Sequence, residues 1–459
     1  MTDEGGITEA ELVAFHRTVG RLRDLPVDDP VRLRAEQVAA SFARDGRLRR
    51  RKGRGADVSA ADAATMAATA TGASDRREDA PLGSAGEVVG RAGELVGHAD
   101  AGGGVYRKPR SCYVCKSPYR QVGSFYHRLC PECAADNSAR RALSTDLGGR
   151  RVLLTGGRVK IGFQLALMML RDGAEVLITS RFPHDAVRRF RAERGGGKWL
   201  DRLTVLAVDL RDPRQVLGLC EELRQAGEPL DILVNNAAQT VRRPPQSYAL
   251  LAAGERAALP EGARQAPGFT PMRMLAGGAA ALPVVLREAD EAGLLPDPSP
   301  ENSWSARLGA LDPAEVLETQ LVNALAPALL CDRLLPLLLA SPRPRRYVIN
   351  VTAVEGRFAV RNKMPGHPHT NMAKAALNML TRTSAAELAD QGVHMCAVDT
   401  GWITDENPAP KKGRMAEAGF RTPLDIVDGA ARVYDPIVRG ESGDPVSGVF
   451  LKDYREAAW

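Results

Sequence analysis

Four of the seven cysteines stand in two C-x-x-C pairs, CYVC and CPEC, with fourteen residues between the pairs. Two such knuckles that face each other supply four thiolates in a tetrahedron, the ligand set that Zn²⁺ prefers. The ligands would be Cys112, Cys115, Cys130 and Cys133. A closed four-sulfur site leaves no open coordination position, so we expect a structural zinc ribbon over residues 106–142, with His127 as a spare ligand. A reactive dithiol is the weaker interpretation, because two pairs occur together.

A second segment, RVLLTGGRVKIG, joins an apolar run to a helical pattern through a glycine-rich turn. Such a turn aims backbone N–H groups and the helix dipole at a pyrophosphate. Gly156 and Gly157 would form the tight turn, and Gly162 would allow close contact between helix and strand. Ordinary strand–helix connections also contain such glycines, so the turn alone does not identify a cofactor site.

The charges around this turn favour a phosphorylated dinucleotide. The next strand-like run ends in Ser180-Arg181, without the carboxylate that would bind the ribose hydroxyls of NAD. Arg158 lies in the turn, and two guanidinium groups would favour a 2′-phosphate through charge-assisted contacts. Lys160 adds positive charge near the phosphates. We therefore expect NADP(H), with NAD as the less favoured cofactor.

Elements that could position these residues follow from residue 148 to the end. Apolar strand-like runs alternate there with helical segments, which indicates an α/β fold with a doubly wound, Rossmann-type parallel sheet. The predicted strands are RVLLTGG, EVLITS, RLTVLAVDL, DILVNNAA, RYVINVTA, VHMCAVDTG and SGVFLKD. Residues 241–310 interrupt the alternation with many Pro, Gly and Ala, and we interpret them as an insertion with only short helices.

The N-terminal part has a different composition. Residues 1–50 carry a helical apolar stripe, and Pro26 and Pro30 interrupt it. Residues 51–105 are rich in small and polar side chains, so we expect a disordered low-complexity linker. The basic run RRRKGR at its start is typical of a solvated linker, and contact with nucleic acid or an acidic partner is the alternative.

Bulk properties limit the class of protein. The chain has 459 residues, with 62 Lys and Arg against 56 Asp and Glu, so its net charge of +6 is mild. Such a charge permits an anionic ligand without requiring nucleic acid. We find no apolar run of transmembrane length and no secretory signal, and the cysteine usage fits a reduced compartment. The expectation is a cytoplasmic protein that does not act at a membrane.

From about residue 148 to 453 the chain resembles the short-chain dehydrogenase/reductase family. TGGRVKIG is similar to that family's TGxxxGxG turn, with Lys160 in place of the middle glycine. VDL at 208–210 resembles the adenine-contacting segment, and NNAA at 235–238 resembles the NNAG strand end. LVNALAP, NMAKAALNML and VDTGWIT are similar to three further segments, which follow in the family's order.

The resemblance implies roles for individual residues. The cofactor-binding set would comprise Gly156, Gly157, Arg158, Lys160, Ile161, Gly162, Arg181, Asp209, Leu210, Asn235, Asn236, Ala237, Lys374 and Gly401. Asn323 and Lys374 would be the family's active-site asparagine and lysine. The resemblance also implies dimers or tetramers built through helices around 313–340 and 371–390.

The usual catalytic serine and tyrosine are missing. Their places hold Ala353 and Thr370, and the alcohol of threonine is a far weaker acid than a phenol. His367 and His369 lie beside the gap, and a histidine titrates in the range useful to a general acid. We take Lys374, Asn323, Thr370 and His369 as the candidate catalytic residues. A loop histidine exposed to solvent is the alternative.

Two functions remain open from the sequence. The first is an NADP(H)-dependent oxidoreductase with a non-standard acid/base set, acting on an unknown small carbonyl or alcohol. The second is a catalytically inactive NADP(H)-binding scaffold whose zinc ribbon contacts a protein or nucleic-acid partner. The retained Lys374 favours the enzyme, whereas Ala353 and Thr370 favour the scaffold.

Overall fold

The computed structural model describes residues 6–77, 80–82, 88–89, 95–96, 103–272 and 289–459. The chain divides into two compact units. The first comprises Met1–Ala64 and Tyr106–Lys108, and the second comprises Thr65–Val105 and Pro109–Trp459. The predicted ribbon therefore belongs, for most of its length, to the same unit as the predicted Rossmann domain.

The N-terminal segment is helical, as predicted, but its helices extend further. Helix α1 (Glu9–Arg23) begins with a capping box at Thr8, and α2 (Pro30–Ala67) begins at the second interrupting proline. The predicted linker is wrong over 51–67, because this alanine-rich stretch forms the end of α2. Two short strands, β1 (Val88–Val89) and β2 (Leu95–Val96), pair within the rest of it, much of which lies outside the described residues.

A nine-stranded sheet forms the centre of the second unit, in the order β13-β12-β11-β10-β8-β5-β6-β7-β9. All seven predicted strands are present and parallel. They are β5 (Arg151–Leu154), β6 (Glu175–Ser180), β7 (Leu203–Ala207), β8 (Ile232–Asn235), β10 (Arg346–Thr352), β11 (Val393–Asp399) and β12 (Phe450–Lys452). The doubly wound α/β class is confirmed.

Two edge strands were not predicted. β9 (Ala263–Gln265) pairs in parallel with β7, and β13 (Arg455–Ala457) turns back antiparallel on β12. β9 lies in the insertion 241–310, so the expectation of short helices alone is wrong there. The insertion also contains α7 (Ala249–Gly254).

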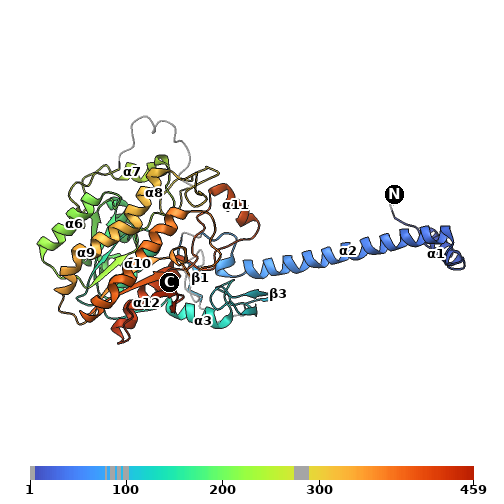
Figure 1. Ribbon diagram of the computed structural model, residues 1–459, viewed down its shortest axis with the longest axis horizontal. Coiled ribbons are helices and arrows are strands. Elements are labelled where there is room, and N and C mark those ends of the chain that lie inside the picture. The colour runs from blue at the N-terminus through green and yellow to red at the C-terminus, as the bar shows by residue number, and fades with distance from the viewer. Residues whose placement is uncertain (1–5, 78–79, 83–87, 90–94, 97–102, 273–288) are drawn as a thin grey trace. The chain divides into compact units, whose positions relative to one another are not determined.

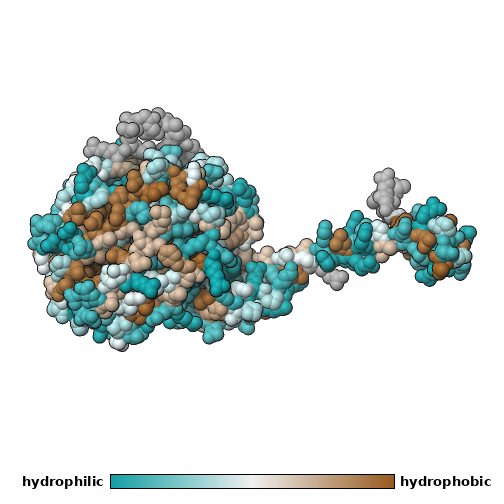
Figure 2. Space-filling model, viewed as in Figure 1, coloured by the Kyte–Doolittle hydropathy of each residue, from teal (hydrophilic) through white to brown (hydrophobic). Residues whose placement is uncertain are grey.

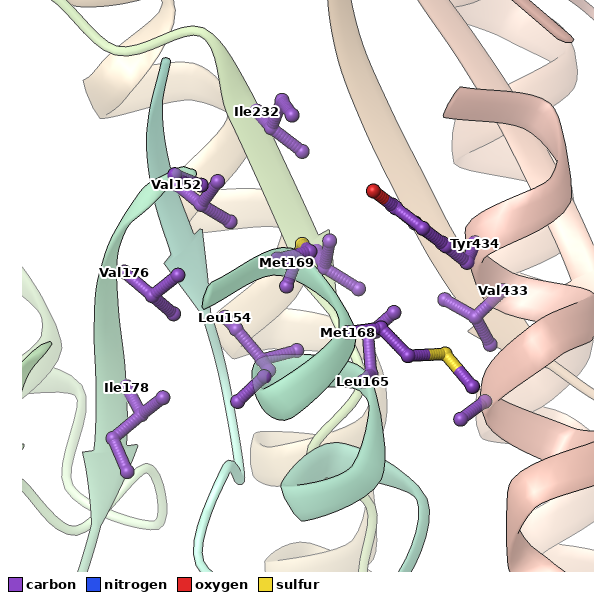
Figure 3. Packing of buried hydrophobic residues seen from close by; sticks show 14 of the residues in the cluster. Val152, Leu154, Leu165, Met168, Met169, Val176, Ile178, Ile232, Val433 and Tyr434 are labelled. Atoms are coloured by element: carbon purple, nitrogen blue, oxygen red, sulfur yellow. The ribbon is translucent and has the colours of Figure 1, made fainter. Parts of the chain in front are cut away.

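Helices cover both faces of the sheet (Figure 1). One face carries α4 (Lys160–Arg171), α5 (Pro183–Ala192) and α12 (Ile426–Glu441). The other carries α6 (Pro213–Ala226), α9 (Ala326–Leu339) and α10 (Pro368–Asp390). Figure 3 shows Val152, Leu154, Val176 and Ile178 directed toward the buried residues of α4 and α12. Leu153 and Leu177, one position along each strand, face the opposite core, as strand alternation requires.

Helix α8 (Pro313–Gln320), a π-helical turn (Leu321–Leu325) and α9 run without a break. By length and composition alone, this is the one helix among the described residues that could cross a membrane. Its inner face packs in the core beside β8 and β10 through Val322, Leu330 and Leu334. Such packing is typical of a core helix, which passes the same length and composition test.

The strand order reverses at β5, which pairs with β6 on one side and β8 on the other. Ligands of open α/β sheets bind in the crevice outside the carboxyl ends of the strands at such a reversal. The predicted glycine turn follows β5 directly.

The cysteine-containing module consists of β3 (Val105–Ser111), β4 (Pro118–Gln121) and α3 (Pro131–Arg140). A further helix, α11 (Ala409–Glu417), follows β11.

Candidate functional site

Four hydrogen bonds connect the glycine turn to the NNAA strand end. Thr155 Oγ1 accepts hydrogen bonds from the backbone N–H groups of Asn236 and Ala237, at 3.0 Å each. The Asn236 amide donates back to the carbonyl oxygens of Thr155 and Gly156, at 3.0 and 3.2 Å. A Cβ at position 162 would lie 2.1 Å from the Gly156 oxygen. Only glycine fits there, so the turn has the shape that the sequence predicted.

Lys160 has a left-handed backbone, with φ of 53°. It occupies the position of the family's middle glycine, and this conformation explains why glycine is favoured there. The lysine begins α4, whose N-terminal end faces the carboxyl edge of the sheet. A lysine in this conformation carries backbone strain that a glycine would avoid.

Arginines crowd the carboxyl end of β6. Arg158 is buried and paired with Asp185 at 2.5 Å, and it also donates to the Ala292 carbonyl of the insertion. Asp185 accepts further bonds from Arg188 and Arg189. Burial alone would raise the pKa of Asp185, but these partners lower it. Arg158 is therefore already engaged, which the sequence did not indicate.

Arg181, the other arginine that the sequence predicted for a 2′-phosphate, makes no ion pair among the described residues. Its guanidinium lies 5.4 Å from the ring centroid of Tyr248 and 5.6 Å from that of Phe182. Its charge also acts on Asp209, the predicted adenine-side residue. Arg211 forms an ion pair with the Asp209 carboxylate at 2.6 Å. Leu210, the residue between these two in the sequence, is buried.

Two of the predicted site asparagines form hydrogen bonds within the protein. Asn235 is buried and donates to Asn350 Oδ1 at 2.8 Å, and Asn350 donates to Thr381 at 2.9 Å. Asn323 lies in the π-helical turn and binds the backbone of Gln239 twice, at 2.7 and 2.9 Å. Its amide thus fixes the chain that leaves β8. π-Helical turns in α-helices are frequent at functional sites.

Lys374 lies inside the protein, at the carboxyl end of β10. Its Nζ donates to the Val351 carbonyl oxygen at 2.8 Å. Burial lowers the pKa of Lys374 to about 8, and the carboxylate of Glu355 opposes this shift. A Cβ at Gly356 would lie 2.6 Å from the Lys374 carbonyl carbon, so the turn after β10 presses directly on α10.

Two threonine hydroxyls near this lysine lack partners. Thr352 Oγ1 and Thr370 Oγ1 are buried and make no hydrogen bond to any residue that the structure describes. Buried polar atoms are normally satisfied, and exceptions call for a ligand, an ion or a water. By the sequence resemblance, Thr370 would hold the family's tyrosine position, and Thr352 precedes Ala353, which would hold the serine position. These hydroxyls are suited to a polar group of a bound ligand.

The two histidines have different surroundings. The His367 ring stacks on Trp304 of the insertion, with centroids 3.8 Å apart, and its Nδ1 lies 3.0 Å from the Trp304 carbonyl. His369 is buried, and its Nε2 is 3.9 Å from Glu315 Oε1. Burial lowers the pKa of His369, and His367 lowers it further. Neither ring is loosely solvated, so the alternative of an exposed histidine loop is wrong.

Glu355 is a titratable group that the sequence analysis missed. It lies in the 3-10 turn Val354–Gly356 between β10 and α10. Burial raises the pKa of its carboxyl, and Asp399 raises it further, while His367 and Lys363 lower it. Its charge also acts on Lys374. The signal in the sequence was an acidic residue directly before Gly356, which alone predicts no role.

The turn after β11 closes the same edge of the sheet. Gly401 has φ of 83°, which glycine adopts without strain. Trp402 is 41% exposed, and its ring centroid lies 5.0 Å from that of Phe420. Asp399 at the end of β11 pairs with Lys452 of β12 at 3.0 Å.

The four cysteines of the two knuckles meet in space. Their sulfur atoms lie within 4.8 Å of one another, and Cys115 Sγ is 3.7 Å from Cys130 Sγ. Cys130 also donates its backbone N–H to Cys112 Sγ at 3.4 Å. His127 is not in this group: it is buried, with Nδ1 2.8 Å from Thr71 Oγ1. The spare-ligand assignment of His127 is therefore wrong, while the four-cysteine cluster is confirmed.

The cysteine module docks on the start of α12. Arg141 donates to Asp425 at 2.5 Å and to Asp428 at 3.1 Å, and all three side chains are nearly inaccessible to solvent. Tyr126 donates to Asp428 Oδ1 at 2.5 Å. The ion pair is buried, so removing either partner would leave an uncompensated charge inside the protein. The contact between the cysteine module and α12 therefore depends on both partners.

Comparison with known proteins places this architecture. Residues 150–252 match the family described as short chain dehydrogenase, and residues 299–422 match the family described as Enoyl-(Acyl carrier protein) reductase. The gap between the two matches falls within the insertion.

Individual proteins are similar over different lengths. Uncharacterized protein R665 of Acanthamoeba polyphaga mimivirus is 32% identical over 351 residues, which are 72% of this chain and 71% of that protein. A probable oxidoreductase of Streptomyces antibioticus is 39% identical over 95 residues, 20% of this chain and 30% of that protein.

Two solved structures match most of the second unit's length at low sequence identity. The carbonyl reductase Sniffer of D. melanogaster is 18% identical, with a TM-score of 0.45, and the match covers 68% of this chain and all of that chain (100%). The Pseudomonas aeruginosa RhlG/NADP active-site complex is 20% identical, with a TM-score of 0.44, over 67% of this chain and 95% of that chain.

Proposed function

Because the chain belongs to the short-chain dehydrogenase/reductase family, we propose that it is an NADP(H)-dependent oxidoreductase whose acid/base groups differ from the family's usual set. The observation that carries this proposal is the intact glycine turn locked to the NNAA strand end, with Lys374 buried at the neighbouring strand end. The substrate would be a small carbonyl compound or the corresponding alcohol.

The preference for NADP(H) rests on charge. Arg158, Arg181, Arg188 and Arg189 gather near the carboxyl end of β6, and Asp185 neutralises only part of their charge. Arg181 is the member of this group that makes no ion pair among the described residues. A 2′-phosphate would bind it through charge-assisted contacts, whereas the ribose hydroxyl of NAD would not.

The residues around Lys374 would carry the proton. When bound, NADPH supplies the hydride, and the reduced carbonyl oxygen then needs a proton. The hydroxyls of Thr352 and Thr370 are free to bind that oxygen. Glu355 is the carboxyl group that acts electrostatically on Lys374, and burial keeps more of it protonated than in water. Glu355 and His369 are the candidate proton donors.

Zinc is proposed for the cysteine cluster. Sulfur atoms within 4.8 Å of one another suit a tetrahedral ion with Zn–S bonds of about 2.3 Å. All seven cysteines are free, so no disulfide competes for these thiols. The closed ligand set supports a structural role for the metal.

Self-association is supported by an exposed apolar surface. Figure 2 shows hydrophobic side chains gathered over α8, α9 and α10. Leu317, Leu325, Met372 and Met379 are each more than half exposed. Exposed patches of this kind mark interfaces, and we propose that a second copy of the chain covers this one. Sedimentation at several concentrations tests it.

Turnover tests the proposed function. NADPH oxidation is measured with a panel of aldehydes, ketones, quinones and enones, with Lys374→Met as the control for background rates. Activity above this control supports the enzyme. Binding of NADPH without any oxidation across the panel would favour the non-catalytic scaffold, which the replacement of serine and tyrosine by Ala353 and Thr370 keeps as the second candidate.

A further inference from the structure

A tyrosine of the cysteine module reaches the sheet edge. Tyr113 stands between Cys112 and Cys115, and its Oη accepts a hydrogen bond from the backbone N–H of Trp402 at 2.8 Å. A Cβ at Gly401 would lie 3.5 Å from the same oxygen. The cysteine module therefore touches the turn after β11 through one hydroxyl group.

The neighbourhood of Tyr113 fixes its ring. Lys452 Nζ lies 5.4 Å from the ring centroid and pairs with Asp399 at 3.0 Å. Asp399 ends β11, two residues before Gly401, and accepts the Gly401 N–H at 3.1 Å. The tyrosine, the lysine and the aspartate thus hold the turn from both sides.

The held loop also contacts the glycine turn. A Cβ at Gly429 of α12 would lie 2.3 Å from Ile403 Cδ1 and 3.0 Å from Ile161 Cδ1, so both isoleucines pack on the same spot of α12. Ile161 belongs to the first turn of α4, directly after Lys160. The charge of Lys160 acts on Glu406, three residues beyond Ile403. The loop 401–406 therefore packs beside the first turn of α4, which follows the predicted pyrophosphate turn.

We propose that the cysteine module is part of the dinucleotide site: Tyr113 positions the Gly401–Trp402 turn, and the metal-bound knuckle positions Tyr113. The affinity for NADP(H) then depends on an occupied four-thiolate site. This inference rests on the proposed function, since it assumes that the crevice takes a dinucleotide. Tyr113 acts as a positioning residue, through the loop it holds.

The dependence of NADP(H) affinity on the metal follows from the position of Tyr113 in the sequence. Cys112 and Cys115, which would both bind the metal, stand at the two ends of its knuckle, so a bound metal would remove most of the backbone freedom of Tyr113. Without the metal, the knuckle would keep bonds such as the one from the Tyr113 N–H to the Arg128 carbonyl, at 2.8 Å, but would lose the link between its two cysteines and the second pair. The loop 401–406 would then lose a fixed hydrogen-bond acceptor on its outer side.

Tyr113→Phe tests this with a matched control. The control is Tyr119→Phe, which removes a hydroxyl of the same module that donates to the His127 carbonyl at 2.8 Å and not to the loop. We expect Tyr113→Phe to raise the NADPH Kd about 3- to 10-fold, the equivalent of one hydrogen bond. Zinc content should stay unchanged, and Tyr119→Phe should leave the Kd unaltered.

Hydrogen exchange of the unliganded protein separates the possible failures. Tyr113→Phe should speed exchange of the Trp402 amide, and removal of the metal by a chelator should do the same and weaken NADPH binding. Unchanged exchange, or faster exchange with an unchanged NADPH Kd, overturns the inference. If the wild-type protein binds no NADPH at all, the proposed function fails instead, and that result is visible before any variant is made.

Discussion

The Lys374 ammonium nitrogen lies 2.8 Å from the Val351 carbonyl oxygen, and the residue is only 5% exposed. Burying an ammonium group costs free energy, which is why the pKa falls from 10.5 to about 8. A lysine kept at such a cost is suited to function rather than to stability.

Lys374→Met should therefore separate stability from function. We expect NADPH binding and turnover to fall, while the free energy of unfolding at pH 7 rises by about 1–2 kcal/mol, because a buried charge is removed. The sign follows from the lowered pKa: the penalty is complete below about pH 8 and disappears as pH rises toward 10.5. Denaturant unfolding of both proteins at pH 7 and pH 10 measures it. A less stable variant at pH 7 would contradict this account.

Arg181→Ala should reduce the preference for NADP(H). Loss of one charge-assisted contact to the 2′-phosphate weakens NADPH binding by about 1.5–3 kcal/mol before solvent screening, and NADH binding should hardly change. Arg158→Ala is the comparison, because its guanidinium is paired with Asp185. That variant should lose stability more than selectivity. Titration of both cofactors checks the pair, and equal wild-type affinities would refute the NADP(H) preference.

Zinc removal should be measurable directly. We expect one Zn²⁺ per chain, and Cys112→Ser should reduce it below about half an equivalent, since the remaining three thiolates bind the ion less tightly. Cys220→Ser is the matched control, because Cys220 is a buried core cysteine away from the cluster. Elemental analysis of the purified proteins decides. An equal zinc content in the two variants would show that the cluster is not the metal site.

Lys160→Gly tests the strained turn. Glycine adopts the left-handed conformation freely, so this variant should be more stable than Lys160→Ala, which keeps the strain, by about 1 kcal/mol. Both variants remove the positive charge, so both should weaken NADPH binding alike if the charge acts on the phosphates. Thermal unfolding and cofactor titration measure the two effects separately. A glycine variant no more stable than the alanine variant would contradict the strain.

The sequence predicted the framework well because it rests on local patterns. All seven central strands are apolar runs with turn residues at their ends, and the glycine turn is set by residues that are close in sequence. The four cysteines were also predictable, since two knuckles of fixed spacing have few other uses. The N-terminal helix α2 extends further than expected because alanine-rich stretches satisfy both helix and linker composition.

Contacts between distant segments were not predictable. Arg158 meets Asp185 of α5, 27 residues away, and the Ala292 carbonyl of the insertion, 134 residues away. His367 stacks on Trp304 of the insertion, and Tyr113 reaches Trp402 across 289 residues. Glu355 could not be predicted, because a single carboxylate in a turn has no sequence pattern of its own. Its burial beside Lys374 depends on the packing of Gly356 against α10.

The pH dependence of turnover distinguishes Glu355 from His369 as the proton donor. A carbonyl reduction needs a protonated donor, so the rate falls as pH rises through the pKa of that donor. Burial raises the pKa of Glu355 above its ordinary value of 4.5, whereas burial lowers the pKa of His369 below 6.5.

If Glu355 is the donor, Glu355→Gln should abolish the fall in rate at high pH and lower turnover about 100-fold or more, the usual contribution of a general acid. His369→Gln should then keep this fall in rate. If His369 is the donor, the two variants exchange these outcomes. Persistence of the fall in rate in both variants would leave the Thr370 hydroxyl, Lys374 and water as the proton route. NADPH affinity should stay near the wild-type value in both variants, which shows that the site is still folded.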